Sequence, residues 1–530
     1  MEADPERTQG TDSSSGVIDW PVFYLSVTVL VALVLPLALF PAAGKDLLNV
    51  AFEYLTRNFG VLYIVAGVAA LVFLLCLAFG QYRHIVFSRG NHAPQFSTLS
   101  WSAMLFCGGI GTSVLYWGTV EWAFYFAQPP FGLAAESAEA LRWAVSYPLF
   151  HWGFIGWAFY CLPGIAMGFA YYVRGAGSLR LSEACANVIP DRFKPVLNPL
   201  IDLIFVVGLV GACSTGIGLA VPLIGTLASH LVGLSRDELG FTLDVAVIVT
   251  ITVLFAGSAW LGLEKGIKRL SNLNVLLAFV LIVFVLLAGP TLFIVELGVQ
   301  SIGHLLQNFL RMSTWTDPRA TGDFVESWTV FYWAWWLALG PFMGVFIAKI
   351  SQGRTIQQVI LGCLGYGTLG CVAFFVVLGN YAAFLELNGV VNVLEQVQTS
   401  GAPHAILSVL STLPAASLVI LLFTVVCVIF AATSYDSAAY TLAIAATRDL
   451  PEAQHPSRAH RIFWAFLLGF LPITLIYMGG LRPLQSAVTL ASVPLLGIMV
   501  VMSWALWRGL GDVRDERAGS SKLQSADTGP

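Results

Sequence analysis

Residues 328–362 read WTVFYWAWWLALGPFMGVFIAKISQGRTIQQVILG. Four aromatic residues fall within five positions of this apolar segment: Tyr332, Trp333, Trp335 and Trp336. Gly340-Pro341 is expected to break the helix, and Lys349 and Arg354 end the segment. Tryptophan in a membrane helix usually lies at the interface, but a cluster beside a helix breaker can line a cavity, where broken backbone is tolerated. Because π faces attract cations that cannot donate hydrogen bonds, the stretch predicts either an aromatic belt with core packing or a box of π faces around a quaternary ammonium group.

The composition decides the class of protein. Hydrophobic residues make up 57% of the chain and charged residues 11%, whereas a soluble domain carries about 25% charged residues. The chain is therefore a polytopic membrane protein in a lipid bilayer. Its net charge of −4 does not indicate nucleic acid as a partner. The eight cysteines show no metal-ligand spacing and no secreted disulfide framework, and the polar residues 1–17 lack the apolar core of a signal peptide.

Apolar runs of about 20 residues mark membrane helices. They predict twelve spans, near 20–41, 60–81, 98–127, 143–172, 198–229, 241–262, 273–297, 325–348, 357–385, 415–445, 461–480 and 486–507. An even number places both termini on one side of the membrane. With the termini inside, the inner connectors hold 19 of the 26 basic residues and the outer connectors hold 7. This positive-inside bias predicts that both termini are cytoplasmic.

The spans divide the chain into six parts. These are a cytoplasmic tail (1–17), two peripheral helices (18–97), a first five-helix unit (98–298), an outer amphipathic connector helix (299–323), a second five-helix unit (324–508) and a short cytoplasmic tail expected to be disordered (509–530). An odd number of helices in each unit would make the two units inverted repeats. The fold class predicted is all-α, with twelve transmembrane helices and inverted five-helix repeats.

Each five-helix unit begins with an interrupted span. Three glycines occupy four positions of the third span (Gly108, Gly109 and Gly111), which is costly in a helix interior. Small residues can serve close helix packing, or they can mark an unwound point that binds ions or substrate. The break expected at Gly340-Pro341 lies about 230 residues later. Interrupted helices at matching positions in two halves indicate a transporter binding site.

Polar residues inside the spans are the remaining candidates. The tenth span holds Thr433 and Ser434 with Asp436 two positions on. Adjacent hydroxyls suit a hard cation, but on these residues alone the favoured interpretation is that they bond back to the previous helical turn. Intramembrane carboxylates are functional candidates, and we expect Glu121 near the outer end of the third span and Asp436 to orient the tenth. No catalytic or metal-binding motif accompanies His151, so an enzyme is not expected.

These residues resemble the betaine/carnitine/choline transporter family over roughly 18–508. The most specific part is FYWAWW…GPFMGVFIAKISQGRTI at 331–356. Supporting matches are GGIGTSVLYWG (108–118), HWGFIGWAFY (151–160), KGIKRLSNLN (265–274) and ATSYDSA (432–438). The resemblance implies twelve helices with LeuT-like inverted repeats, alternating access, a homotrimer and a multi-pass location in the bacterial inner membrane. It implies a small onium substrate, usually zwitterionic, and no organic cofactor.

The resemblance carries over residue by residue to an aromatic box. The box positions it implies are Trp335 and Trp336 in the eighth span, Trp152, Trp157 and Tyr160 in the fourth, and Tyr116 in the third. Leu339 stands where the family often has one more tryptophan. Backbone amides of the glycine segment, at Gly109 and Gly111, would bind the carboxylate of the substrate.

The sodium-coupled members of the family bind one sodium ion between the third and tenth spans. The matching positions here are the carbonyls of Cys107, Ile110 and Phe430 and the hydroxyls of Thr433 and Ser434. Asn274 stands where sodium-independent exchangers carry an arginine, and Leu209 and Cys213 fall on a second sodium site, which is therefore expected to be weakened. However, GGIGTSVLYWGTVEW at 108–122 is closer to the carnitine-type exchangers.

The sequence thus predicts sodium-coupled import of a zwitterion such as glycine betaine or carnitine. Sodium-independent exchange of the carnitine type and proton-coupled choline uptake remain alternatives. A channel is a further alternative, although it would need no aromatic box.

Overall fold

The computed structural model describes residues 17–90, 93–108, 111–261, 264–319, 322–448 and 456–527. Nearly all of these residues are helical, and the two strands found among them, β1 (Val17–Ile18) and β2 (Thr447–Arg448), pair antiparallel. The longer helices, in chain order, are α1 (Trp20–Leu39), α2 (Pro41–Phe79), α3 (Thr98–Gly108), α4 (Thr112–Ala127), α5 (Ala138–His151), α6 (Phe154–Gly168), α8 (Lys194–Val232), α9 (Arg236–Leu261), α10 (Glu264–Ala288), α11 (Thr291–Thr314), α12 (Phe331–Ile350), α18 (Ala416–Ala445), α19 (Arg458–Met478) and α20 (Arg482–Asp527).

Shorter helical pieces connect or extend these helices. They are η1 (Pro130–Gly132), η2 (Phe169–Val173), α7 (Leu181–Cys185), η3 (Asp191–Phe193), η4 (Val325–Val330), α13 (Ile356–Gly362), η5 (Cys363–Gly367), α14 (Thr368–Phe374), η6 (Phe375–Gly379), α15 (Asn380–Leu387), α16 (Val393–Thr399) and α17 (Ala402–Ser411). The pieces α13 to α15 follow one another without a gap, so residues 356–387 form one long helix with π-helical turns.

The prediction of an all-α polytopic membrane protein is confirmed. Ten helical segments in the described part of the chain are long and apolar enough to cross a membrane, and the bent pair of α3 and α4 makes an eleventh. Helix α9 lies where the sixth span was predicted, at 241–262. The total of twelve spans and the inverted relation of the two units stay predictions.

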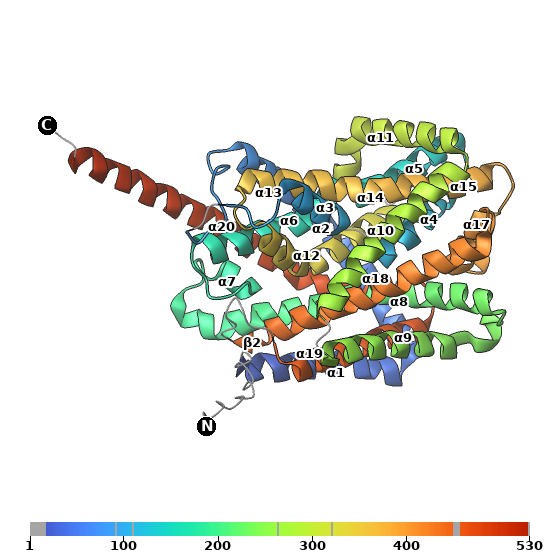
Figure 1. Ribbon diagram of the computed structural model, residues 1–530, viewed down its shortest axis with the longest axis horizontal. Coiled ribbons are helices and arrows are strands. Elements are labelled where there is room, and N and C mark those ends of the chain that lie inside the picture. Colours follow the sequence, from blue (N-terminus) through green and yellow to red (C-terminus); the bar gives the residue numbers. More distant parts are fainter. Residues whose placement is uncertain are drawn as a thin grey trace, which may run out of the picture.

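Residues of the predicted inner connectors meet on one side of the molecule. Strand β1 pairs with β2, Arg180 lies 3.4 Å from the Asp19 carboxylate, and Arg174 lies 3.3 Å from Glu516. Strand β2, which pairs with β1 near the start of the chain, and the projecting end of α20 lie on this same side of the bundle (Figure 1). An even number of crossings between the termini requires this arrangement, while the assignment of the side as cytoplasmic stays a prediction.

The first predicted break is confirmed. Helix α3 ends at Gly108, α4 begins at Thr112, and the two helices are bent by 57° relative to each other. Gly109 and Ile110, predicted to bind substrate and sodium, lie outside the described residues.

The second predicted break, at Gly340-Pro341, is wrong, because α12 runs from Phe331 to Ile350 without interruption. Its glycines serve close packing instead. A Cβ on Gly340 would lie 2.8 Å from the carbonyl oxygen of Phe159, and a Cβ on Gly344 would lie 2.7 Å from the Cβ of Pro163. The residues that suggested a break therefore allow α12 to approach α6 closely.

A break that the sequence did not predict interrupts the fourth span. Helix α5 ends at His151 and α6 begins at Phe154, with Trp152 and Gly153 between them. A Cβ on Gly153 would lie 2.6 Å from the carbonyl oxygen of Leu149, so this turn needs a glycine. The break places the Trp152 side chain at the middle of the bundle.

Two boundaries also differ from the prediction. The seventh span ends at Ala288 rather than 297, so the amphipathic helix α11 begins at Thr291 rather than 299. The tail 509–530 was expected to be disordered, but α20 continues to Asp527 and projects from the bundle (Figure 1). Ion pairs of Arg174 with Asp512 and Glu516 hold the base of this projection to the bundle.

The close packing of α12 on α6 yields a stability prediction. Gly344→Ala would place a methyl group against the ring of Pro163 and 3.0 Å from the backbone nitrogen of Gly164, which cannot move aside. We expect a loss of about 1–3 kcal/mol in the free energy of unfolding, measured as a lower melting temperature in detergent. Gly497→Ala in α20, where a Cβ meets no atom within 4 Å, is the matched control and should not melt earlier. Equal melting of the two variants would contradict the packing role.

Candidate functional site

A cavity of about 180 Å³ lies at the centre of the bundle. Its lining comes from the end of α3, the start of α4, the α5–α6 break, α6, α8, α12, α18 and α19. Within the described part of the chain, no charged side chain lines it. The volume is below the range of about 300–1,000 Å³ typical of drug-sized ligands, so the cavity suits a small molecule.

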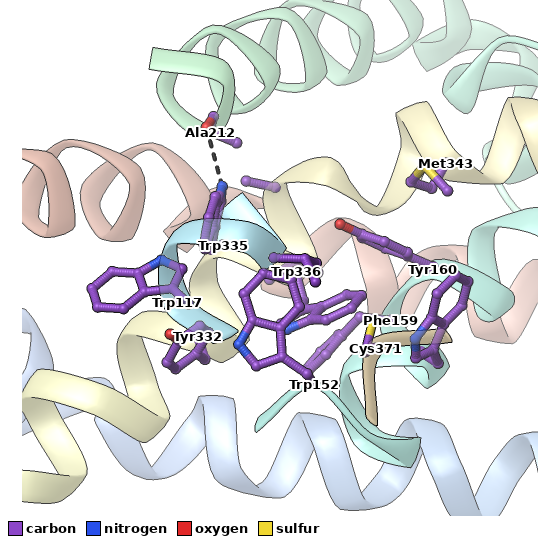
Figure 2. Close-up of a cluster of buried hydrophobic side chains, with 14 of the residues drawn as sticks. Trp117, Trp152, Phe159, Tyr160, Ala212, Tyr332, Trp335, Trp336, Met343 and Cys371 are labelled. Carbon is purple, nitrogen blue, oxygen red and sulfur yellow. Dashed lines mark hydrogen bonds between the residues drawn. The ribbon is translucent and has the colours of Figure 1, made fainter. Parts of the chain in front are cut away.

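Aromatic side chains from α6, α12 and the α5–α6 break gather on one side of this cavity. The ring centroid of Trp336 lies 4.4 Å from that of Tyr160, 5.6 Å from that of Trp152 and 6.0 Å from that of Trp157. Figure 2 shows Trp336 between Trp152 and Tyr160, with Trp335 beside it. The Trp335 Nε1–H donates a hydrogen bond to the carbonyl oxygen of Ala212 in α8 (3.1 Å), which fixes the orientation of that indole.

Four of the predicted box residues face the cavity: Trp152, Tyr160, Trp335 and Trp336. Trp157 packs behind Trp336 and does not line the cavity, and Tyr116 packs 5.0 Å from Trp117, also away from it. The 4.4 Å between Tyr160 and Trp336 leaves no room for a trimethylammonium group between these two rings. A cation would therefore lie on the cavity side of the cluster, against the exposed faces and edges of the rings.

Glycines on the neighbouring helices make room for the tryptophans. A Cβ on Gly156 would lie 2.6 Å from Cε2 of Trp336, and a Cβ on Gly367 would clash with the Trp157 indole. These glycines shape the cluster as much as the aromatic residues do. They were not identified from the sequence, because a glycine that makes room for a distant side chain leaves no local pattern.

The first turn of α4 also lines the cavity, near Trp335, because a Cβ on Gly216 would lie 3.7 Å from the Ser113 hydroxyl oxygen and 3.8 Å from Cζ2 of Trp335. Gly111, Thr112 and Ser113 line the cavity together with Gly108 at the end of α3. The first backbone amides of a helix have no partner within the helix and carry a partial positive charge. The Thr112 hydroxyl donates to the carbonyl oxygen of Cys427 (3.0 Å), which joins this turn to α18. The arrangement can bind an anionic group at the start of α4 in the same cavity as the aromatic cluster.

The predicted sodium residues are distributed as follows. Ser434 lines the cavity, whereas Cys107, Phe430 and Thr433 do not. The Thr433 hydroxyl donates to the carbonyl oxygen of Ile429 (2.9 Å), which is the backbone bonding that the sequence alone favoured. This bond uses the hydroxyl hydrogen and leaves oxygen lone pairs for a cation. Asn274 is buried and its Nδ2 donates to the carbonyl oxygen of Val426 (3.2 Å), so α10 contacts α18 one turn before Phe430.

Several cavity residues were not identified as substrate contacts from the sequence. Cys213 of α8 and Met343 of α12 both line the cavity, as does Leu339, the residue that departs from the usual tryptophan. No residue type or spacing distinguishes Cys213 and Met343 from the many apolar residues around them.

The two carboxylates singled out from the sequence, Glu121 and Asp436, occupy different environments. Asp436 forms an ion pair with Arg461 (3.0 Å) between α18 and α19, which agrees with the expected orienting role. Glu121 lies six positions before the end of α4, is fully buried, and accepts a hydrogen bond from the Trp152 indole (3.0 Å). The sequence predicted only that Glu121 lies near the outer end of its span, and it did not predict the hydrogen bond with Trp152.

Comparisons with known proteins identify the family of this chain. Residues 21–514 match the family described as BCCT, betaine/carnitine/choline family transporter. The chain is 37% identical to the uncharacterized transporter YeaV of Escherichia coli (strain K12) over 438 residues, which cover 82% of this chain and 89% of that protein. It is 33% identical to a carnitine transporter of Acinetobacter baumannii over 491 residues, which cover 92% of this chain and 88% of that protein.

Proposed function

Because the chain belongs to the betaine/carnitine/choline transporter family, and is therefore a transporter rather than an enzyme, we propose that it imports a quaternary ammonium zwitterion by alternating access, coupled to sodium. Carnitine and glycine betaine are the first candidates. The 33% identity to a carnitine transporter supports carnitine in particular. We further propose that it works in the bacterial inner membrane as a homotrimer with cytoplasmic termini.

The proposal rests on a small cavity whose lining includes six aromatic side chains and, among the described residues, no charged side chain. The six are Trp152, Tyr160, Trp335, Trp336, Phe342 and Tyr435. A trimethylammonium group has no N–H to donate and a diffuse charge, so hydrogen-bond acceptors are of little use to it. Each aromatic face contributes about 1–2 kcal/mol toward binding such a cation when water is excluded. A carboxylate in direct contact would attract the cation too, but at a large desolvation cost.

The other end of a zwitterion needs hydrogen-bond donors. The first turn of α4, at Thr112 and Ser113, offers backbone amides and the positive end of a helix in the lining of the same cavity. The onium group would lie against Trp152, Trp335 and Trp336 while the carboxylate contacts this turn. Choline, which has no carboxylate, would use only the aromatic side.

Sodium would cross the membrane together with the substrate, as a co-transported ion. The oxygens that would hold it are the hydroxyls of Thr433 and Ser434 and the carbonyl of Phe430, on one turn of α18, together with the carbonyls of Cys107 and Ile110. The unused lone pairs of Thr433 and the exposure of Ser434 to the cavity support this role. An ion at this position would share the α3–α4 break with the substrate, which would couple the two binding events.

Removing one of these hydroxyls should weaken sodium coupling. For Thr433→Ala and Ser434→Ala we expect the sodium concentration at half-maximal uptake to rise about tenfold, equivalent to about 1.4 kcal/mol for a lost oxygen ligand, with smaller changes in substrate affinity at saturating sodium. Thr441→Val is the matched control, because this hydroxyl on the same helix also bonds back to the backbone (2.9 Å to the oxygen of Ser437) but lies two turns from the site. Unchanged sodium dependence in both variants would mean that the ion assignment is wrong.

The proposed function is tested by uptake into proteoliposomes. Labelled glycine betaine, carnitine and choline are each measured with and without an inward sodium gradient, and with and without unlabelled substrate inside. Sodium-driven accumulation into empty vesicles is the expected result. Uptake that ignores sodium but requires substrate inside would instead establish an exchanger, and uptake driven by a proton gradient would establish proton coupling.

A further inference from the structure

Behind the aromatic cluster lies a buried network centred on Glu121. Its carboxylate accepts hydrogen bonds from the hydroxyls of Tyr125 (2.7 Å) and Tyr332 (2.5 Å) and from the Trp152 indole N–H (3.0 Å). Glu121, His151 and Tyr332 have no exposed surface. The network draws on α4, the α5–α6 break and α12, each of which also contributes residues to the cavity lining.

The hydrogen bonds can be satisfied with an ionised Glu121 and a neutral His151. Oε2 accepts from both Tyr332 and Trp152, and Oε1 accepts from Tyr125. The Tyr125 oxygen then accepts from the Nδ1–H of His151 (2.9 Å), and the Nε2 of that ring accepts from the Thr329 hydroxyl (3.1 Å). Hydrogen bonds to the charged form of a carboxylate stabilise that form, and here the carboxylate has three donors.

The charge of Glu121 has no permanent counter-ion. In the described part of the chain, no lysine or arginine lies within ion-pair distance of the Glu121 carboxylate. The one basic group within that distance is the His151 imidazole, whose Nδ1 lies 3.6 Å from Oε1 of Glu121. A buried charge is costly unless it is paired. One indole ring separates it from the cavity, since Trp152 donates to Glu121 with its N–H while lining the cavity.

We propose that Glu121 is a positioning and specificity-determining residue, which supplies the counter-charge for the onium group through the Trp152 indole. By accepting the indole N–H···O hydrogen bond, Glu121 fixes the orientation of the Trp152 ring. The negative charge of the Glu121 carboxylate, next to the indole N–H, also polarises the Trp152 ring. The ring surface toward the cavity therefore attracts a cation more strongly. Glu121 thereby favours a positively charged head group over a neutral group of the same shape. This inference rests on the proposed function.

The test compares two ligands that differ only in this charge. Glycine betaine carries a trimethylammonium group, and 3,3-dimethylbutanoate carries a tert-butyl group of the same shape on the same carboxylate. The affinities of both ligands are measured by competition against labelled glycine betaine. If carnitine binds more tightly, labelled carnitine is used as the labelled ligand instead. Wild-type protein should prefer glycine betaine. In Glu121→Gln, which keeps the size of the side chain and removes the charge, we expect this preference to fall about tenfold, as the Coulomb energy of a unit charge across one ring predicts.

Purely structural damage would weaken both ligands together and leave their ratio unchanged, and that outcome overturns the proposal. Glu121→Asp, which keeps the charge, should retain most of the preference. In a Trp152→Phe background, which lacks the N–H donor, Glu121→Gln should change the preference less than in the wild-type background. Thr119→Val on the same helix is the matched control, because its buried hydroxyl bonds, among the described residues, only to the backbone oxygen of Leu115 (2.8 Å).

The experiment separates this inference from the proposed function. If wild-type protein binds none of glycine betaine, carnitine or choline, the proposed function fails. If the wild type prefers the onium ligand and Glu121→Gln preserves the full preference, the proposed function stands and the role of Glu121 is wrong.

Discussion

Replacing Trp336 with leucine is expected to weaken onium binding by about tenfold or more. Trp336 contacts Tyr160, Trp152 and Trp157 and presents its ring to the cavity. Leucine retains apolar bulk but has no π face, so about 1–2 kcal/mol of direct attraction is lost, and Tyr160 and Trp157 lose the ring against which they pack. The measurement is the affinity for glycine betaine and carnitine in detergent, together with uptake in proteoliposomes.

The matched control for this substitution is Trp333→Leu. Trp333 lies on the same helix and is equally buried, but it packs against Phe150 and Phe159 and does not line the cavity. Both substitutions should lower the melting temperature, since deleting buried aromatic side chains typically costs several kcal/mol. Only Trp336→Leu should lower affinity in the protein that remains folded. If the affinity of Trp336→Leu stays within about threefold of the wild-type affinity, a difference of less than 1 kcal/mol, then Trp336 is not part of the binding site.

The membrane class of the fold was predictable because hydrophobic length is a local property of the sequence. Helices α1, α8, α18 and α19 coincide with predicted spans to within a few residues. The prediction failed where a glycine has two possible uses. Gly108 and Gly111 lie at a break, whereas Gly340 and Gly344 lie inside a continuous helix because Phe159 and Pro163 of α6 approach them. That approach joins residues about 180 positions apart, and no local pattern encodes it.

The site was predictable to a similar degree. Aromatic residues that contact one another beside the cavity, such as Trp152 and Trp336, belong to motifs that carry the family resemblance, so their grouping could be anticipated. Tyr116 and Trp157 belong to the same motifs but lie outside the cavity lining, because the direction of a side chain depends on helix rotation. The hydrogen bond from Tyr332 to Glu121 joins positions 211 residues apart. Such a contact follows only from the packing of α12 against α4.

Covalent modification of Cys213 is expected to block transport, and this is the second prediction with a large effect. It is partly buried and lines the cavity on α8, next to Ala212, whose carbonyl oxygen holds Trp335. A thiosulfonate reagent that carries a trimethylammonium group resembles the proposed substrate at one end and is reactive at the other. The Cys213 thiolate would attack the sulfenyl sulfur, form a mixed disulfide and release methanesulfinate. We expect nearly complete loss of uptake, because the attached onium group would occupy the aromatic side of the cavity permanently.

Protection by substrate would show that the inactivation results from modification of a cysteine in the cavity. Glycine betaine or carnitine should slow the inactivation in proportion to its occupancy of the cavity, and Cys213→Ala should transport and resist the reagent. Cys76→Ala should remain sensitive, because Cys76 is exposed on α2 outside the cavity. The uncharged methyl methanethiosulfonate should react more slowly than the onium reagent if π faces concentrate cations beside Cys213. Full sensitivity of Cys213→Ala would show that another cysteine controls transport, and inactivation without substrate protection would place Cys213 away from the path of the substrate.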